Sequence, residues 1–243
     1  MCSAVVIGAT TGVGRALARA LAKRGRDLVV VARSERDLQA TASDLALRFG
    51  IRADVIALDI ARPDLDVDKL VEQCARTTGE VDTVFIPAGA VLDTDVGACP
   101  DVVGPITAVN YLGPAKIAAA FGREMARRGK GAVVMFSSIA AAAPRSRNAA
   151  YSAAKAALEV YARALRHELE PKGVRVAVLA LGYVDTRLSF GMQLRFRVAT
   201  PNEVATFAMG SDLRGRHYYP RFWWWITCVL RHLPWSVYRR LSF

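Results

Sequence analysis

Residues 3–21 read SAVVIGATTGVGRALARAL: an apolar run, a glycine-rich turn and an amphipathic stretch in succession. Gly8, Gly12 and Gly14 have the spacing GxxxGxG. Between a strand and a helix, glycines at such spacing permit a tight turn and let backbone N–H groups approach a pyrophosphate at the helix N-terminus. The other interpretation is an ordinary glycine-rich turn, but the position in the first strand–helix unit favours a dinucleotide site.

The same alternation of apolar runs and amphipathic stretches continues through most of the chain. Strands are predicted at residues 4–8, 27–32, 53–59, 81–87, 131–137 and 174–181. Helices are predicted at residues 12–24, 35–49, 65–77, 102–128 and 149–170. The strands are near-continuous in Val, Ile, Ala and Leu, as expected for parallel strands covered on both faces. We therefore predict an α/β fold with a doubly wound, Rossmann-type parallel sheet.

The rhythm changes after Leu181. Residues 182–200 are predicted to form a loop or short helix, 201–209 a short helix, and HYYP (217–220) a last strand. Because neither an internal repeat nor a linker is found, residues 1–243 are interpreted as a single domain. Its divergent part, 187–243, is expected to hold a substrate loop and an aromatic, basic C-terminal tail.

The formal net charge of +11 is concentrated near the C-terminus, where residues 187–243 hold nine arginines against Glu203 and Asp212. Such a basic end favours nucleic acid, an anionic membrane surface or an anionic substrate as partner. The four cysteines and three histidines are scattered, so neither a metal site nor a disulfide framework is predicted. With no secretory signal and no apolar run long enough to span a bilayer, a cytoplasmic protein is expected.

The second predicted strand ends VVVARSE, which bears on the choice of nicotinamide cofactor. An acidic residue near this point binds the ribose 2′-hydroxyl of NAD, whereas an arginine accommodates the 2′-phosphate of NADP. Arg33 and Ser34 therefore favour NADP, with a solvated loop arginine as the alternative. Asp59 ends the third strand, where it is a candidate contact for the adenine or a helix cap.

The stretch YSAAK places Tyr151 and Lys155 one turn apart on one face of a long helix. Ser138 ends the preceding strand, AVVMFSS. With the glycine turn, these motifs resemble the short-chain dehydrogenase/reductase family over roughly residues 4–186. The resemblance implies that Ser138, Tyr151 and Lys155 are catalytic, and that Asn110 in VNYLG holds a water in the proton relay.

The resemblance also implies which residues contact the cofactor. LGYVDT resembles the PGxVxT segment that meets the nicotinamide carboxamide, and Lys155 matches the lysine that holds the nicotinamide ribose. The implied cofactor-binding residues are Gly8, Thr10, Thr11, Gly12, Val13, Gly14, Arg33, Ser34, Asp59, Ile60, Ala88, Gly89, Tyr151, Lys155 and Thr186. The chain departs from the family at residues 86–89, where NNAG is replaced by IPAG, and at Leu181, which replaces a proline.

The activity implied by the resemblance is NADP(H)-dependent interconversion of a ketone and a secondary alcohol by hydride transfer, with Tyr151 as general acid/base. A free tyrosine titrates near pH 10, and a lysine ammonium about 4 Å away lowers that pKa. Lys155 is therefore expected to bring Tyr151 closer to neutrality, where an acid/base is effective. The alternative is a non-catalytic NADP(H)-sensing regulatory or interaction protein on the same fold, which the complete set of catalytic residues disfavours.

Residues 221–235, RFWWWITCVLRHLPW, have two main interpretations. One is a helix buried in the core or in a dimer interface. The other is a helix at the surface of an anionic membrane, with tryptophans at the headgroup boundary and arginines on the lipid phosphates. Nucleic-acid binding is disfavoured because the arginines stand among large apolar groups and no recognition motif is present.

Some short-chain reductases that act on long-chain keto-lipids or polyprenyl-linked sugars end in similar aromatic, basic tails. The resemblance therefore suggests a lipidic or polyprenyl-linked carbonyl substrate, reached from the inner face of a membrane through residues 221–243; a small soluble carbonyl is the other substrate class. Family members commonly pair their long helices across a two-fold axis, so a homodimer or homotetramer is expected through helices 102–128 and 149–170.

Overall fold

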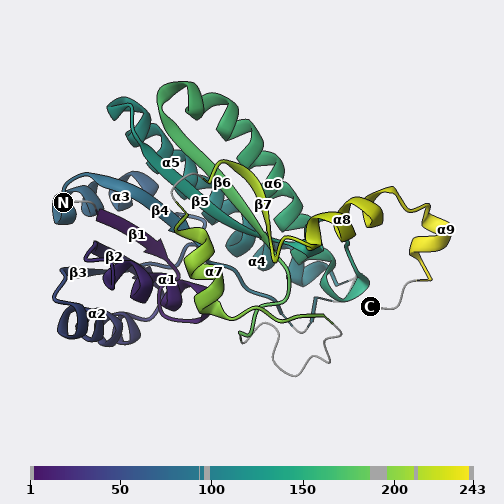
Figure 1. The fold of residues 1–243 in the computed structure, drawn as a ribbon, viewed down its shortest axis with the longest axis horizontal. Helices are drawn as coiled ribbons and strands as arrows, with labels where there is room; N and C mark the ends of the chain where they lie inside the picture. Colours follow the sequence, from purple (N-terminus) through teal and green to yellow (C-terminus); the bar gives the residue numbers. More distant parts are fainter. Residues whose placement is uncertain (1–2, 93, 96–98, 187–195, 211–212, 241–243) are drawn as a thin grey trace.

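The computed structural model describes residues 3–92, 94–95, 99–186, 196–210 and 213–240. Its centre is one seven-stranded sheet with the order β3-β2-β1-β4-β5-β6-β7, parallel throughout (Figure 1). The strands are β1 (Ser3–Ile7), β2 (Asp27–Ala32), β3 (Ala53–Ala57), β4 (Val81–Ile86), β5 (Gly131–Ser138), β6 (Val174–Leu181) and β7 (Gly215–Tyr219). The predicted Rossmann-type sheet is confirmed, and so is the last strand expected at HYYP.

Helices cover both faces of this sheet. The main helices are α1 (Gly12–Ala22), α2 (Glu35–Phe49), α3 (Val67–Thr78), α4 (Val103–Thr107), α5 (Gly113–Arg128), α6 (Ala149–Leu169), α7 (Pro201–Ala208), α8 (Trp223–His232) and α9 (Trp235–Tyr238). With one exception, the predicted strands and helices end within two residues of the observed ones. Of the predicted loop 182–200, residues 187–195 lie outside the described residues.

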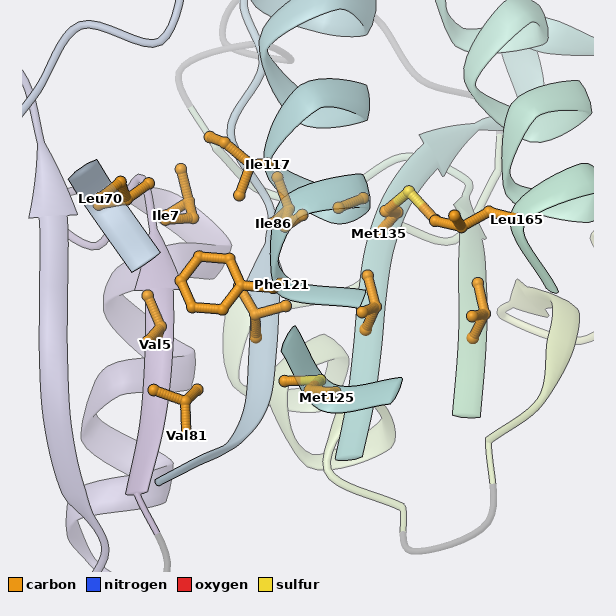
Figure 2. Close-up of a cluster of buried hydrophobic side chains, with 14 of the residues drawn as sticks. Val5, Ile7, Leu70, Val81, Ile86, Ile117, Phe121, Met125, Met135 and Leu165 are labelled. Carbon is orange, nitrogen blue, oxygen red and sulfur yellow. The ribbon is translucent and has the colours of Figure 1, made fainter. Parts of the chain in front are cut away.

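Alternate residues of each central strand feed two separate cores. Val5 and Ile7 of β1 pack with α3, α5 and α6, whereas Ala4 and Val6 pack with α1, α2 and α7. Figure 2 shows the first core, with Phe121 of α5 beside Val5 and Ile7. Helices cover both faces of the central strands, so residues that point to either face are buried. This two-sided burial explains why the strands read as near-continuous apolar runs in the sequence.

The exception is the predicted helix 102–128, which is helical over its whole length but not a uniform α-helix. A 3₁₀ turn at Pro100–Val102 leads into α4, and a turn of π-helix at Ala108–Leu112 connects α4 to α5. Pro114 is consistent with this local change, because it has no N–H to donate to the carbonyl of Asn110 one turn earlier. The wider π turn contains Asn110, one of the predicted site residues.

The strand order reverses beside β1, since β2 and β3 lie on one side of it and β4 to β7 on the other. In open α/β sheets ligands bind in the crevice at the carboxyl ends of the strands, where the order reverses. The turn after β1, the end of β4 and the end of β5 all lie at this edge. The fold therefore places the predicted site residues where such a sheet binds its ligand.

Residues 221–243, the C-terminal segment, follow β7. Its helices α8 and α9 project from the sheet at the end of the molecule opposite the N-terminus (Figure 1). Trp223 anchors α8 in a small cluster with Ile139, Ala180 and Tyr218. The hydroxyl of Tyr238 in α9 donates a hydrogen bond of 2.6 Å to the carbonyl of Pro144. None of the helices in the described part of the chain is long and apolar enough to cross a membrane.

Candidate active site

The glycine-rich turn after β1 is built so that two of its glycines cannot be replaced without strain. Gly8 has a φ of 91° and Gly12 a φ of 49°, in the region that L side chains rarely adopt. Gly14 has ordinary helical geometry, but a Cβ atom there would lie 2.0 Å from the carbonyl oxygen of Gly8. The turn and the first turn of α1 are thus in direct backbone contact.

The N-terminus of α1 presents its backbone N–H groups without competition from its own side chains. Thr11 precedes the helix with extended backbone and makes no side-chain capping bond, and no acidic residue occurs in the first turn. Thr10 and Val13 flank this position on the same turn. Free N–H groups and the positive end of the helix dipole suit an anion such as a pyrophosphate. The residues present therefore fit the predicted dinucleotide.

Two loops close around this turn, and one of them also contacts Asn110 of the π turn. A Cβ atom on Gly8 would lie 3.3 Å from the Cα of Ala88, and one on Gly12 would lie 3.2 Å from the Cγ2 of Thr186. A Cβ atom on Gly89 would lie 2.9 Å from the side-chain oxygen of Asn110. The structure thus brings together residues that are far apart in the sequence and that the resemblance assigned to one site.

The residues at the ends of β2 and β3 are less closely bound to the site. Arg33 is exposed, and Ser34 accepts a hydrogen bond of 3.3 Å from the backbone N–H of Asp37 as the N-cap of α2. Asp59 accepts a hydrogen bond of 3.0 Å from the N–H of Ala61 in a turn, and the next helix, α3, is capped by Asp66 instead. The adjacent Ile60 is buried.

Ser138, Tyr151 and Lys155 converge where β5 meets α6. Ser138 is the last residue of β5, and its hydroxyl lies close enough to Tyr151 to favour the ionised form of the phenol and so to lower its pKa. The Nζ atom of Lys155 donates a hydrogen bond of 3.0 Å to the carbonyl of Phe136 and lies 5.8 Å from the centre of the Tyr151 ring. Lys155 is only 3% exposed, so its ammonium group stands at the floor of the site.

Asn110 is fully buried beside this group. Its amide nitrogen donates to the carbonyls of Ala90 (2.8 Å) and Ile106 (3.0 Å), and its side-chain oxygen accepts from the N–H of Ala90 (3.2 Å). The last contact fixes the segment after β4 against the π turn. Asn110 therefore has a clear structural role in addition to the relay role implied by the resemblance.

Burial dominates the titration of the site. It lowers the pKa of Lys155 to about 8, because an ammonium group inside the protein loses its hydration. Burial also raises the pKa of Tyr151, and the hydrogen bond from Ser138 opposes this only in part. The prediction that Lys155 brings the pKa of Tyr151 down towards neutrality is therefore wrong in direction, because loss of hydration is the larger effect and raises that pKa.

Sequence reasoning missed two acidic residues next to the site. Asp95 is buried at the N-terminus of α6. Glu159, one turn beyond Lys155, accepts hydrogen bonds from Ser137 (2.9 Å) and Arg216 (2.9 Å) and a longer one from Arg231 of α8 (3.4 Å). Neither carboxylate belongs to a sequence motif. The hydrogen-bond partners of each lie more than twenty residues away in the sequence, so no local pattern indicates its role. Glu159 joins the C-terminal segment to the strand that carries Ser138.

Comparison with known proteins shows the family of the chain. The family model for short chain dehydrogenases matches residues 3–193, and the chain belongs to this family of oxidoreductases. A very-long-chain 3-oxoacyl-CoA reductase of Neurospora crassa is 29% identical over 94% of this chain and 70% of its own length. The human inactive hydroxysteroid dehydrogenase-like protein 1 is 32% identical over 76% of this chain, which spans 57% of that relative.

Among solved structures, an alcohol dehydrogenase from the archaeon Thermococcus sibiricus, complexed with 5-hydroxy-NADP, is similar with a TM-score of 0.78. It is 26% identical, and the match covers 90% of this chain and 95% of that one. The structural likeness therefore extends beyond the residues matched by the family model, into the C-terminal part of the chain.

Proposed function

We propose that this protein is an NADP(H)-dependent oxidoreductase that interconverts a ketone and a secondary alcohol, with Tyr151 as general acid/base. The observation that carries the proposal is the convergence of Ser138, Tyr151, Lys155 and Asn110 at the sheet edge that also holds the glycine turn. An uncapped helix N-terminus, three glycines and a buried acid/base set suit dinucleotide-dependent carbonyl chemistry.

The pyrophosphate of the cofactor would be held by the N-terminus of α1 together with Gly8, Gly12 and Gly14. The path of the cofactor would be lined by Ala88 and Gly89. The nicotinamide carboxamide would meet Thr186. Bound NADPH supplies the hydride for reduction, and NADP accepts it for oxidation. The exposed Arg33 at the end of β2 supports a preference for the 2′-phosphate of NADP. The NADP analogue bound by the Thermococcus relative supports the same preference.

In the direction of reduction, the carbonyl carbon gains the hydride while the Tyr151 hydroxyl donates its proton to the carbonyl oxygen. Ser138 donates a hydrogen bond to the same oxygen and so stabilises the charge that develops there. The raised pKa of Tyr151 keeps the hydroxyl protonated and ready to act as an acid. Lys155 titrates near neutrality, with a pKa of about 8, and so can return a proton to the tyrosine.

Replacing Tyr151 by Phe tests this assignment. Turnover should fall by about 10²- to 10⁴-fold, because only the proton donor is lost. The affinity for NADPH, measured by quenching of protein fluorescence, should change little. The matched control is Tyr161→Phe on the same helix, since Tyr161 packs edge-on against Tyr111 away from the catalytic serine. If Tyr151→Phe turned over as fast as the unaltered protein, Tyr151 could not be the acid.

A second candidate function is a non-catalytic NADP(H)-sensing protein, and one observation favours it: the human relative is named as inactive. The unaltered protein separates the two candidates. An NADPH-binding protein without turnover on any carbonyl class would be a sensor. The presence of Ser138, Tyr151 and Lys155 together supports the enzyme.

We further propose that the substrate is a lipidic or polyprenyl-linked carbonyl compound reached from an anionic membrane surface. The name of the Neurospora relative, a very-long-chain 3-oxoacyl-CoA reductase, supports a long acyl chain next to the reacting carbonyl. The C-terminal segment supports the membrane surface, because Trp225 is 68% exposed and Trp235 is 72% exposed. No acidic residue follows Asp212 in the sequence, whereas six arginines do.

The substrate proposal is tested by comparing a long-chain 3-oxoacyl-CoA, a polyprenyl-linked ketone and a short soluble ketone, each with and without anionic vesicles. Higher kcat/KM for a lipidic compound, raised further by vesicles, is expected. A preference for the short ketone that vesicles leave unchanged would contradict the proposal.

We propose a homodimer or homotetramer that pairs through the helices α4 to α6. Large apolar side chains stand exposed on these elements, namely Val103, Leu112 and Val160, which suits burial against a second copy. Analytical ultracentrifugation of the protein and of Val160→Asp should show loss of the oligomer in the variant. A monomeric parent protein would contradict the proposal.

A further inference from the structure

The segment between β4 and α4 is bound at two points to residues of the proposed catalytic set. Near its start, the backbone of Ala90 exchanges two hydrogen bonds with the side chain of Asn110. Five residues later, the side chain of Asp95 is bound to the N-terminus of α6, the helix that carries Tyr151. The segment thus connects Asn110 to Tyr151 across the carboxyl edge of the sheet.

Asp95 uses both of its carboxylate oxygens in this contact. Oδ1 accepts a hydrogen bond of 3.0 Å from the backbone N–H of Ala150, and Oδ2 accepts one of 2.9 Å from the N–H of Tyr151. The side chain is almost completely enclosed, with Asp95 1% exposed. Two charge-assisted bonds in a buried place hold their geometry better than one bond to a neutral acceptor.

The capping of α6 is unusual in coming from a distant part of the chain. Asn148, the residue that precedes the helix, makes no side-chain capping bond of its own. The orphan N–H groups of the first turn are instead satisfied by Asp95, which lies 55 residues before Ala150. A negative carboxylate there also complements the positive end of the helix dipole.

The position of the cap matters because Tyr151 is the third residue of α6. Its backbone N–H is one of the two groups that Asp95 holds, so the cap fixes the backbone from which the phenol ring projects towards Ser138. If the first turn frays, the distance between the two hydroxyls is no longer fixed. Small losses of alignment are costly in a proton transfer, which needs the donor within hydrogen-bond reach of the acceptor.

We propose that Asp95 is a positioning residue for the reaction: it fixes Tyr151 against Ser138 and ties the segment after β4 to the catalytic helix. This inference rests on the proposed function, since it assigns Asp95 a role in a proton transfer by Tyr151. It extends that function to a carboxylate that does not touch the reacting atoms and belongs to no sequence motif.

The competing explanation is that Asp95 merely stabilises a helix, as any cap does. Asp66 provides a matched control, because its Oδ1 accepts a hydrogen bond of 2.9 Å from the N–H of Lys69 at the N-terminus of α3. That helix begins away from Tyr151, and Asp66 is exposed. Asp66→Ala therefore removes a cap without touching the catalytic helix.

The experiment compares Asp95→Ala, Asp95→Asn and Asp66→Ala in the full chain, with a long-chain 3-oxoacyl-CoA and NADPH as probes. In Asp95→Ala, kcat should fall about tenfold or more, while the affinity for NADPH stays within about twofold. The solvent deuterium isotope effect on kcat should rise, because proton transfer from a poorly placed tyrosine becomes rate-limiting. Amide exchange at Ala150 and Tyr151 should accelerate.

Asp95→Asn should have a higher kcat than Asp95→Ala, because the amide oxygen can still accept one of the two hydrogen bonds. If Asp95→Ala does not fold, the comparison is made with Asp95→Asn. Asp66→Ala should leave kcat and the isotope effect unchanged. Equal kcat and equal isotope effects in the Asp95 and Asp66 variants would overturn the inference. Tyr151→Phe separates a failure of the proposed function from a failure of the positioning role. Full activity in Tyr151→Phe refutes the proposed function. Loss of activity in Tyr151→Phe with full activity in Asp95→Ala refutes only the positioning role.

Discussion

The glycine-rich turn and the C-terminal segment are the two stretches that stand out in the sequence, and the structure treats them differently. In the turn, Gly14 is crowded by the backbone of Gly8 from the same short stretch, and Gly8 and Gly12 have a positive φ that favours glycine. In the C-terminal segment, three successive tryptophans have three environments: Trp223 is 3% exposed, Trp224 44% and Trp225 68%. The spacing of the glycines therefore predicts the backbone geometry of the turn. The run of tryptophans does not predict which of its side chains are buried.

Gly14→Ala is expected to have the largest effect, and it tests whether the geometry of the glycine-rich turn is needed for cofactor binding. The new Cβ atom would lie 2.0 Å from the carbonyl oxygen of Gly8, so the turn has to move away from α1. The dissociation constant for NADPH, measured by fluorescence titration, should rise by about a hundredfold or more. The control is Gly104→Ala in α4, where a Cβ atom meets open space. Unchanged NADPH affinity in Gly14→Ala would show that the turn does not hold the cofactor.

The second prediction compares Trp223→Ala with Trp225→Ala. Removing the enclosed Trp223 should lower the free energy of unfolding by about 3–5 kcal/mol, because a cavity is left beside Tyr218 and Ile139. Trp225→Ala should leave the unfolding free energy nearly unchanged but weaken sedimentation with anionic vesicles. Chemical denaturation and vesicle sedimentation measure the two effects. Equal losses of stability in both variants would mean that the exposed and buried tryptophans do not differ as described.

The smallest expected effect is that of Arg33→Ala. If Arg33 accommodates a 2′-phosphate, its removal should narrow the ratio of kcat/KM for NADPH over NADH by about tenfold, equivalent to about 1.4 kcal/mol. Arg36→Ala is the matched control, because Arg36 is an exposed arginine one turn further along. An unaltered ratio would identify Arg33 as a surface residue with no part in cofactor choice.

The architecture and the clustering of the motif residues were predictable because they depend on local patterns. Near-continuous apolar runs gave the strands, and the residues singled out by motif come together at one edge of the sheet. Asp59 was left open between an adenine contact and a helix cap; its hydrogen bond to the N–H of Ala61 belongs to a turn, and Asp66 caps the next helix.

Other features depend on tertiary contacts or on competing energies and were missed. The helix expected at 102–128 contains a turn of π-helix just before Pro114, whose missing N–H could have indicated an irregularity there. Asp95 could not have been found, because its partners lie 55 residues away. The pKa of Tyr151 was predicted in the wrong direction, because the sequence says nothing of how deeply the hydroxyl is enclosed.

The fit between Gly182 and Trp223 limits how far the chain can be shortened or fused. A Cβ atom on Gly182 would lie 2.0 Å from the indole nitrogen of Trp223, so the C-terminal segment fills a space that a glycine leaves for it, four residues before Thr186. A chain ending at Pro220 would leave a hole the size of an indole next to the cofactor side of the molecule. A fusion partner attached beyond Tyr238 leaves this contact intact, so an engineered fusion should extend the chain there.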